Sequence, residues 1–130
     1  FKQYNRTFKP TQTEFDWLST SSTNVHNYIH DPLCGYPIST RYYRDMFEFM
    51  RLCFRHDEIA KIEKTTSLLV AWGALDPCTQ FGKGTRAFIQ RLQRADLATA
   101  QIEYPNMRHE ILNEDNRMQV YQDIAQLIQA

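Results

Sequence analysis

Two stretches of apolar and polar residues in the second half of the chain have the length of β-strands. Residues 67–73 read SLLVAWG, a nearly unbroken apolar run. Such a run is typical of a strand that is covered on both faces, as in a parallel sheet. Residues 98–104 read ATAQIEY and end at a proline. Their alternation predicts a second strand, which ends before Pro105.

Apolar residues at helical spacing follow each predicted strand. The first helix is expected over residues 80–94, and its apolar side comprises Phe81, Phe88, Ile89 and Leu92. The last helix should be capped by Asn113 and carry Glu114 and Asp115 in its first turn, where the helix dipole favours anions. Its buried residues are expected to be Met118, Tyr121, Ile124, Leu127 and Ile128. The order strand, helix, strand, helix predicts an α/β fold.

The first half of the chain has a different pattern. From Phe1 to Ser22 it predicts a loop, held to a core by the aromatic residues of FDWL at 15–18. Ser21 or Ser22 should cap a short helix that ends at Asp31.

A longer helix is expected over residues 41–54, capped by Ser39 or Thr40. Its apolar stripe comprises Tyr43, Met46, Phe47, Met50, Cys53 and Phe54. One interpretation is that this stripe packs against a core. The other is that it belongs to a lid helix whose methionines also line an acyl-chain pocket.

Composition narrows the classes of function. The chain has 130 residues, the size of one domain, with 15 basic and 15 acidic residues. Because the charges cancel, no broad positive field favours nucleic acid, and we expect no nucleic-acid partner. The longest apolar run, residues 68–75, is far shorter than the roughly 20 residues that span a bilayer. Three separated cysteines, Cys34, Cys53 and Cys78, suit free thiols in a reducing compartment, so we expect a soluble, cytoplasmic protein.

Two polar residues follow the predicted strands. Asp76 lies in the turn GALDP after the first strand, and His109 lies in the loop PNMRH after the second. The carboxyl ends of parallel strands share one edge of a sheet, so these side chains should meet there. An aspartate that holds an imidazole prepares it to act as a general base. On these residues alone, a purely structural hydrogen bond is an equally good interpretation.

Three segments give the chain a resemblance to a known family. They are DWLS with VHNYIHDPLCGY (16–19 and 25–36), AWGALDP with FGKG (71–77 and 81–84), and YPNMRHEILNE (104–114). In this order and spacing they resemble the second half of α/β-hydrolases of the monoacylglycerol lipase, lysophospholipase and serine aminopeptidase type. The resemblance implies that residues 1–54 are the end of a helical cap with its return helix. It also implies that residues 55–130 are the C-terminal part of the α/β core.

The same resemblance implies a function. Asp76 and His109 would be the acid and base of a catalytic triad, with no cofactor and no metal. The nucleophilic serine of such enzymes lies in a G-x-S-x-G turn, and no such motif occurs in the 130 residues. We therefore expect the nucleophile and the oxyanion hole upstream of this chain. Thr20-Ser21 and Ser67 depart from the family pattern, which affects the cap rather than the triad.

Other motifs give weaker evidence for a functional site. HEILN is not the zinc motif H-E-x-x-H, because position 113 is asparagine. His26, His30 and Cys34 are spaced by four, but Pro32 interrupts their helix; we interpret both histidines as partly exposed. The glycines of GKGT at 82–85 more readily form a helix start than a phosphate loop. Cys78 is interpreted as a small apolar filler, and Arg108 and Glu110 as solvated loop charges.

Three hypotheses remain from the sequence. The first is the C-terminal portion of a serine hydrolase that cleaves a lipid-like ester, monoacylglycerol or lysophospholipid. The second is an aminopeptidase of the same fold, in which Glu14, Asp16 or Glu48 would bind the substrate's amino group. The third is a non-catalytic fragment or interaction module. Because two strands leave a sheet edge open, we expect the missing N-terminal half or another copy to cover it. Peripheral membrane contact through the cap is a further expectation.

Overall fold

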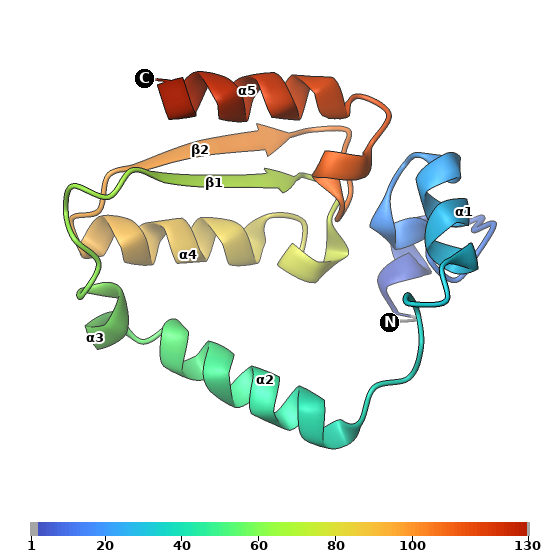
Figure 1. The fold of residues 1–130 in the computed structure, drawn as a ribbon, viewed down its shortest axis with the longest axis horizontal. Helices are drawn as coiled ribbons and strands as arrows, with labels where there is room; N and C mark the ends of the chain where they lie inside the picture. The colour runs from blue at the N-terminus through green and yellow to red at the C-terminus, as the bar shows by residue number, and fades with distance from the viewer. Residues whose placement is uncertain (1–2, 130) are drawn as a thin grey trace.

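The core of the molecule is a pair of parallel strands with a helix on each face. A computed structural model describes residues 3–129. Strands β1 (Leu68–Gly73) and β2 (Thr99–Tyr104) pair in parallel over their whole lengths, from Leu68 opposite Thr99 to Gly73 opposite Tyr104. Helix α4 (Lys83–Arg94) lies on one face and helix α5 (Arg117–Gln129) on the other (Figure 1). The predicted strands, and the prediction that β1 is covered on both faces, are confirmed.

Two apolar clusters hold these layers together, one on each face of the sheet. On the α4 side, Leu92 and Leu97 are buried with Ile59, and Leu68 and Val70 of β1 pack against them. On the α5 side, the cluster consists of Tyr104, Met107 and Val120, with Ala71, Ile102, Ile111 and Ile124 packed against it. Alternate residues of β1 therefore face opposite layers, as the pleat of a strand requires.

Helix α4 begins at Lys83, three residues later than predicted. Gln80, Phe81 and Gly82 have φ angles of 54°, 56° and 78°, in the left-handed region, so the chain cannot be helical before Lys83. Gly82 is the N-terminal cap residue, which confirms that the glycines of this segment form a helix start. Ile89 and Leu92 are buried as expected, whereas Phe81 lies outside the helix and is exposed.

The prediction for the last helix is wrong at its start and in its buried face. Residues Ile111–Asn113 form a 3-10 turn, α5 begins only at Arg117, and Glu114 is buried before the helix. Glu114 leaves the helix because its carboxylate accepts hydrogen bonds from distant segments. On α5 the fully buried residue is Val120, with half-buried Ile124 and Leu127 at helical spacing behind it. Met118, Tyr121 and Ile128 are exposed.

Replacing Val120 with alanine should lower the free energy of unfolding by about 2 kcal/mol, because two buried methyl groups are lost and a cavity remains. Ile128, on the same helix, is 79% exposed, so Ile128→Ala should change stability by less than about 0.5 kcal/mol. Urea unfolding of both variants measures the difference. Equal effects would contradict the register of α5 described above.

The first half of the chain forms short helices beside the sheet. It contains the 3-10 turns η1 (Tyr4–Thr7) and η2 (Asp16–Leu18) and the helix α1 (Ser22–His30), which Ser21 caps. Helix α2 (Thr40–Cys53), capped by Ser39, and the short helix α3 (His56–Ile59) lead into β1. Both predicted helices and the buried aromatic anchor Trp17 are confirmed. Phe1, where the predicted loop begins, lies outside the described residues.

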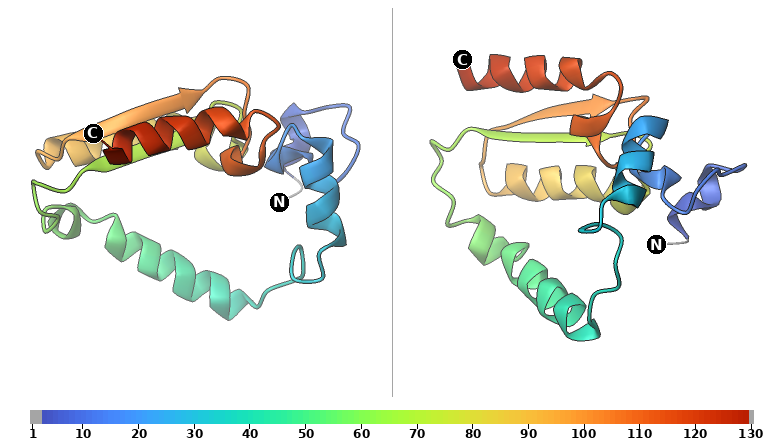
Figure 2. Two further views of the ribbon diagram at one scale, coloured as in Figure 1. Left: turned by 45° about the horizontal axis from the view of Figure 1, so that its top comes forward. Right: turned by 45° about the vertical axis from the view of Figure 1, so that its right-hand side comes forward.

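Helix α2 lies apart from the sheet and has no buried residue (Figures 1 and 2). Its apolar side chains are largely exposed, among them Phe47, Phe49 and Met50. The interpretation that this stripe packs against a core is therefore wrong for the part of the chain described. Within residues 3–129, no helix has the length and apolar character needed to cross a membrane.

Candidate active site

Asp76 is held in a tight turn directly after β1. Its backbone N–H donates to the carbonyl of Gly73 at 3.1 Å. One carboxylate oxygen, Oδ1, accepts from the backbone N–H of Cys78 at 2.8 Å, which caps the 3-10 turn Pro77–Thr79. The carboxylate is buried, with 4% of the residue exposed. The turn thus fixes Asp76 and leaves its second oxygen, Oδ2, directed at the loop that follows β2.

That second loop carries His109 and lies against the first. The N–H groups of Ala74 and Leu75 donate to Tyr104 and Met107 at 2.9 and 3.0 Å. A side chain at Gly73 would collide with the backbone carbonyls of Met107 and Arg108, so the close approach of the two loops requires glycine there.

The two predicted residues meet at this edge of the sheet. His109 Nδ1 lies 3.2 Å from Asp76 Oδ2, within hydrogen-bonding distance. The expected proximity of Asp76 and His109 is confirmed, while their catalytic role stays a prediction. The indole ring of Trp17 lies 5.2 Å from the imidazole, at 45° between the ring planes. The imidazole therefore has a carboxylate at Nδ1 and an aromatic ring beside it, and 42% of its side chain is exposed.

Electrostatics at the site favour a charged imidazole. The hydrogen bond to Asp76, and after it the neighbouring Cys78, raise the pKa of His109 to about 10, while burial acts in the opposite direction. Burial raises the pKa of Tyr4, and Cys78 and Asp76 add to this. An aspartate that stabilises imidazolium in this way stabilises the state that a general base reaches after it takes a proton. The base must start as the neutral ring, so a raised pKa confines its action to the neutral fraction of His109, which grows as the pH rises.

Cys78 is exposed and lies beside the pair, so its interpretation as an apolar filler is wrong. One ligand atom each of Asp76, Cys78 and His109 lies within 4.8 Å of the others, and thiolate, imidazole and carboxylate are ligands of zinc-like metals. Both carboxylate oxygens of Asp76 already have hydrogen-bonding partners. The other candidate set of metal ligands, with its four-residue spacing, begins with His26 and His30. Their rings stack at 3.9 Å between centres, and both residues are exposed, as interpreted.

A cavity of about 710 Å³ adjoins the pair. It is lined by Asp76 and His109 and by Trp72 and Phe88. Met50, near the end of α2, and Phe54, the residue after α2, also line it. A second, aromatic cavity of about 570 Å³ lies between Trp17 and the segment around Gly35. The chemistry of Asp76 and His109 is therefore next to space with mainly apolar walls.

Arg108 and Glu110, on either side of His109, are not free loop charges, which corrects their interpretation. The Arg108 guanidinium donates to the carbonyls of Asp16 and Ser19, and lies 4.1 Å from the Phe8 ring centre. Burial lowers the pKa of Arg108. Glu110 accepts from the Asn24 side chain at 2.6 Å.

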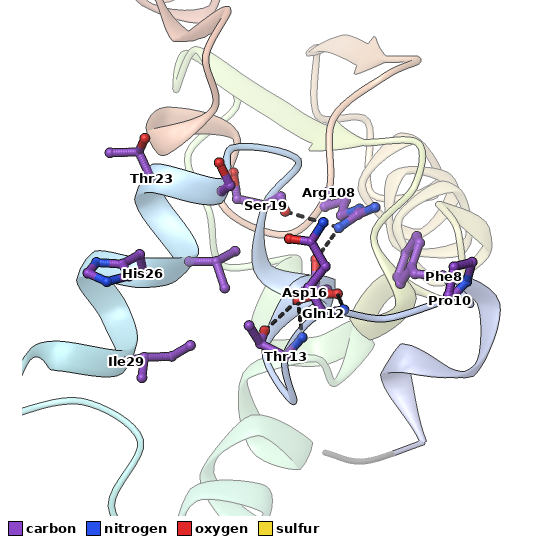
Figure 3. Close-up of a pocket in the computed structure, with 12 residues that line it drawn as sticks. Phe8, Pro10, Gln12, Thr13, Asp16, Ser19, Thr23, His26, Ile29 and Arg108 are labelled. Atoms are coloured by element: carbon purple, nitrogen blue, oxygen red, sulfur yellow. Dashed lines mark hydrogen bonds between the residues drawn. The ribbon is translucent and has the colours of Figure 1, made fainter.

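Figure 3 shows Arg108, Asp16 and Ser19 together in the wall of a third cavity of about 560 Å³. Of the two charges next to the imidazole, Arg108 thus binds the segment that leads into α1, and Glu110 binds Asn24 within α1.

Comparisons with known proteins fit this geometry. A carboxyl esterase from Bacillus coagulans, solved with glycerol, superposes with a TM-score of 0.86 at 23% identity, covering 96% of this chain and 41% of that one. A lipase in its open form superposes with a TM-score of 0.79 at 24% identity, covering 94% and 41%. The chain thus spans less than half the length of either structure. No curated protein sequence matches.

Sequence comparison gives the family. The family model described as serine aminopeptidase, S33, matches residues 2–116, which is most of the chain. The two solved structures support the fold, an α/β-hydrolase of which this chain has the C-terminal part. The chain belongs to the serine aminopeptidase S33 family of α/β-hydrolases.

Proposed function

We propose that this chain supplies the acid and base of a serine hydrolase that cleaves carboxylic esters, of the monoacylglycerol or lysophospholipid type. The observation that carries the proposal is the 3.2 Å contact between His109 Nδ1 and Asp76 Oδ2 at the edge of an apolar cavity. The esterase and lipase named above support an ester substrate by analogy of fold.

The proposed reaction uses the free nitrogen of the imidazole. A serine outside this chain attacks the acyl carbonyl, and His109 Nε2 takes its proton and then donates it to the leaving alcohol. The same nitrogen next takes a proton from the water that attacks the acyl-enzyme, and returns it to the serine oxygen as the acyl–oxygen bond breaks and the acid leaves. Asp76 holds the ring and stabilises the imidazolium. The walls contributed by Met50, Phe54 and Trp72 suit an acyl chain.

Exposed surfaces of the chain suggest two kinds of partner. The pair β1 and β2 leaves sheet edges that the rest of the protein, or a second copy, would cover. The exposed apolar residues of α2 would contact a lipid surface peripherally. The description of the family model supports the aminopeptidase alternative. Of the carboxylates considered for the substrate's amino group, Asp16 is poorly suited, because both of its oxygens accept hydrogen bonds from its own loop, from Gln12 and Thr13.

The test is a substrate panel with the complete protein. We expect hydrolysis of p-nitrophenyl acyl esters, monoacylglycerol and lysophospholipid, and little hydrolysis of aminoacyl-anilides. A fluorophosphonate probe should label the complete protein and leave the 130-residue chain unlabelled. Preference for the anilides would favour the aminopeptidase, and labelling of the 130-residue chain would contradict a nucleophile outside it. An unlabelled complete protein would favour a non-catalytic module.

A further inference from the structure

Glu114 is the most deeply buried acidic residue among those described, with 1% of the residue exposed. It lies five positions after His109, in the extended link between a 3-10 turn and α5. The mechanism proposed above does not use it. A buried carboxylate needs hydrogen-bonding partners, so its surroundings indicate what it does.

The partners of Glu114 are all donors, and they come from two separate segments. From the segment before α1, the Ser19 hydroxyl donates at 2.9 Å, and Thr20 donates with its backbone N–H at 2.9 Å and its hydroxyl at 2.5 Å. From the loop after β2, the backbone N–H of Arg108 donates at 2.8 Å. A carboxylate, which only accepts, is suited to four donors in a way that an amide is not.

These bonds fix the backbone on the N-terminal side of His109, and two further hydrogen bonds hold the residues on either side of it. The N–H of Glu110 donates to the carbonyl of Leu18 at 2.8 Å, and the Arg108 guanidinium donates to the carbonyl of Ser19 at 3.1 Å. Residues 16–20, which also carry Trp17 beside the imidazole, and residues 108–114 therefore form one hydrogen-bonded unit around His109.

We propose that Glu114 is a positioning residue: by binding Arg108, Ser19 and Thr20 together, it sets the distance between the His109 ring and Asp76. The proposal rests on the proposed function. Its physical basis is that the His109 side chain is partly exposed and is held by Asp76 at 3.2 Å, by the neighbouring Cys78 and by the Trp17 ring, so its position also depends on the backbone on either side. A misplacement of about 1 Å in such a constellation can lower a rate about 100-fold.

The test compares Glu114→Gln with Asp115→Asn in the complete protein. Both variants remove one negative charge, at adjacent positions, but Asp115 is exposed. In E114Q the amide NH₂ faces donors, so we expect kcat for a soluble ester to fall about 10- to 100-fold with KM changed less than about threefold. D115N should keep the wild-type kcat. Histidine NMR should show a weaker His109 to Asp76 hydrogen bond in E114Q alone.

Thr20→Val and Ser19→Ala provide graded variants, each removing one of the four donors, and they decide the matter in the same assays should E114Q not fold. Each should lower kcat by less than E114Q does. A folded variant with a lower unfolding midpoint, but with wild-type kcat and an unchanged His109 NMR signal, would overturn the proposal and leave Glu114 a purely structural residue. If the wild-type protein cleaves no ester, the proposed function fails, while the NMR comparison still decides the role of Glu114.

Discussion

Replacing His109 with alanine should lower kcat/KM of the complete protein for an ester by about 10⁴-fold or more, as removal of the base does in other serine hydrolases. Among the described residues, His109 is the only histidine in the loops that follow the two strands, and its Nδ1 is already engaged with Asp76.

The comparison for this variant is His56→Ala. His56 is exposed at the start of α3, before β1, and its loss should change kcat/KM by less than about twofold. Initial rates on a p-nitrophenyl ester, measured with circular dichroism to verify folding, give the result. Wild-type activity in a folded H109A variant would show that the pair is structural and that the base lies elsewhere.

The two strands and the acid and base could be predicted from sequence because their determinants are local. β1 is an unbroken apolar run, and Asp76 and His109 each follow a strand by a few residues. Parallel pairing then brings the strand ends to one edge, whatever the loops do in detail. The start of α1 was equally local, since a serine cap needs only a donor three residues on, here Asn24.

Glu114 could not be predicted in the same way. Its position before an apolar stripe is typical of a helix start, and its actual partners, Ser19 and Thr20, are 94 to 95 residues away. Arg108 was misinterpreted for the same reason, because its acceptors belong to residues 16 and 19. Interactions between distant segments leave no periodicity in the sequence. The one available signal was that Glu114 lies within residues 104–114, the segment that carries the family resemblance and His109.

Helix α2 illustrates a different limit of prediction from sequence. Its apolar stripe is real, and its helix and cap were predicted, but within the part of the chain described most of the stripe is exposed, and Phe54 at its end contacts the Phe88 ring at 5.0 Å between ring centres. Amphipathic spacing predicts that a face will be covered; it does not say by what. Met50 and Phe54 line the cavity beside His109, which favours the lid interpretation as a proposal.

Changing Asp76 to asparagine should lower kcat/KM by about 10⁴-fold while keeping the shape of the site. The asparagine oxygen can still accept from the N–H of Cys78, as Oδ1 of Asp76 does. Its NH₂ group then faces His109 Nδ1, which must become an acceptor, so the ring proton moves to Nε2. That nitrogen must be free if His109 is to act as a base. Asp45→Asn, on the exposed side of α2, is the matched control and should have wild-type rates.

The same substitution should change how stability depends on pH. Asp76 is the largest cause of the raised pKa of His109, which is about 10 in the folded chain against an ordinary 6.5. A raised pKa means that the folded state binds the proton more tightly, so the pair stabilises the fold fully below about pH 6.5 and loses this contribution as the pH rises through 10. In D76N the loss of stability between pH 6.5 and 10 should shrink, and the His109 pKa measured by NMR should fall. A variant with wild-type rates and the wild-type pH dependence would mean that Asp76 does not hold the base.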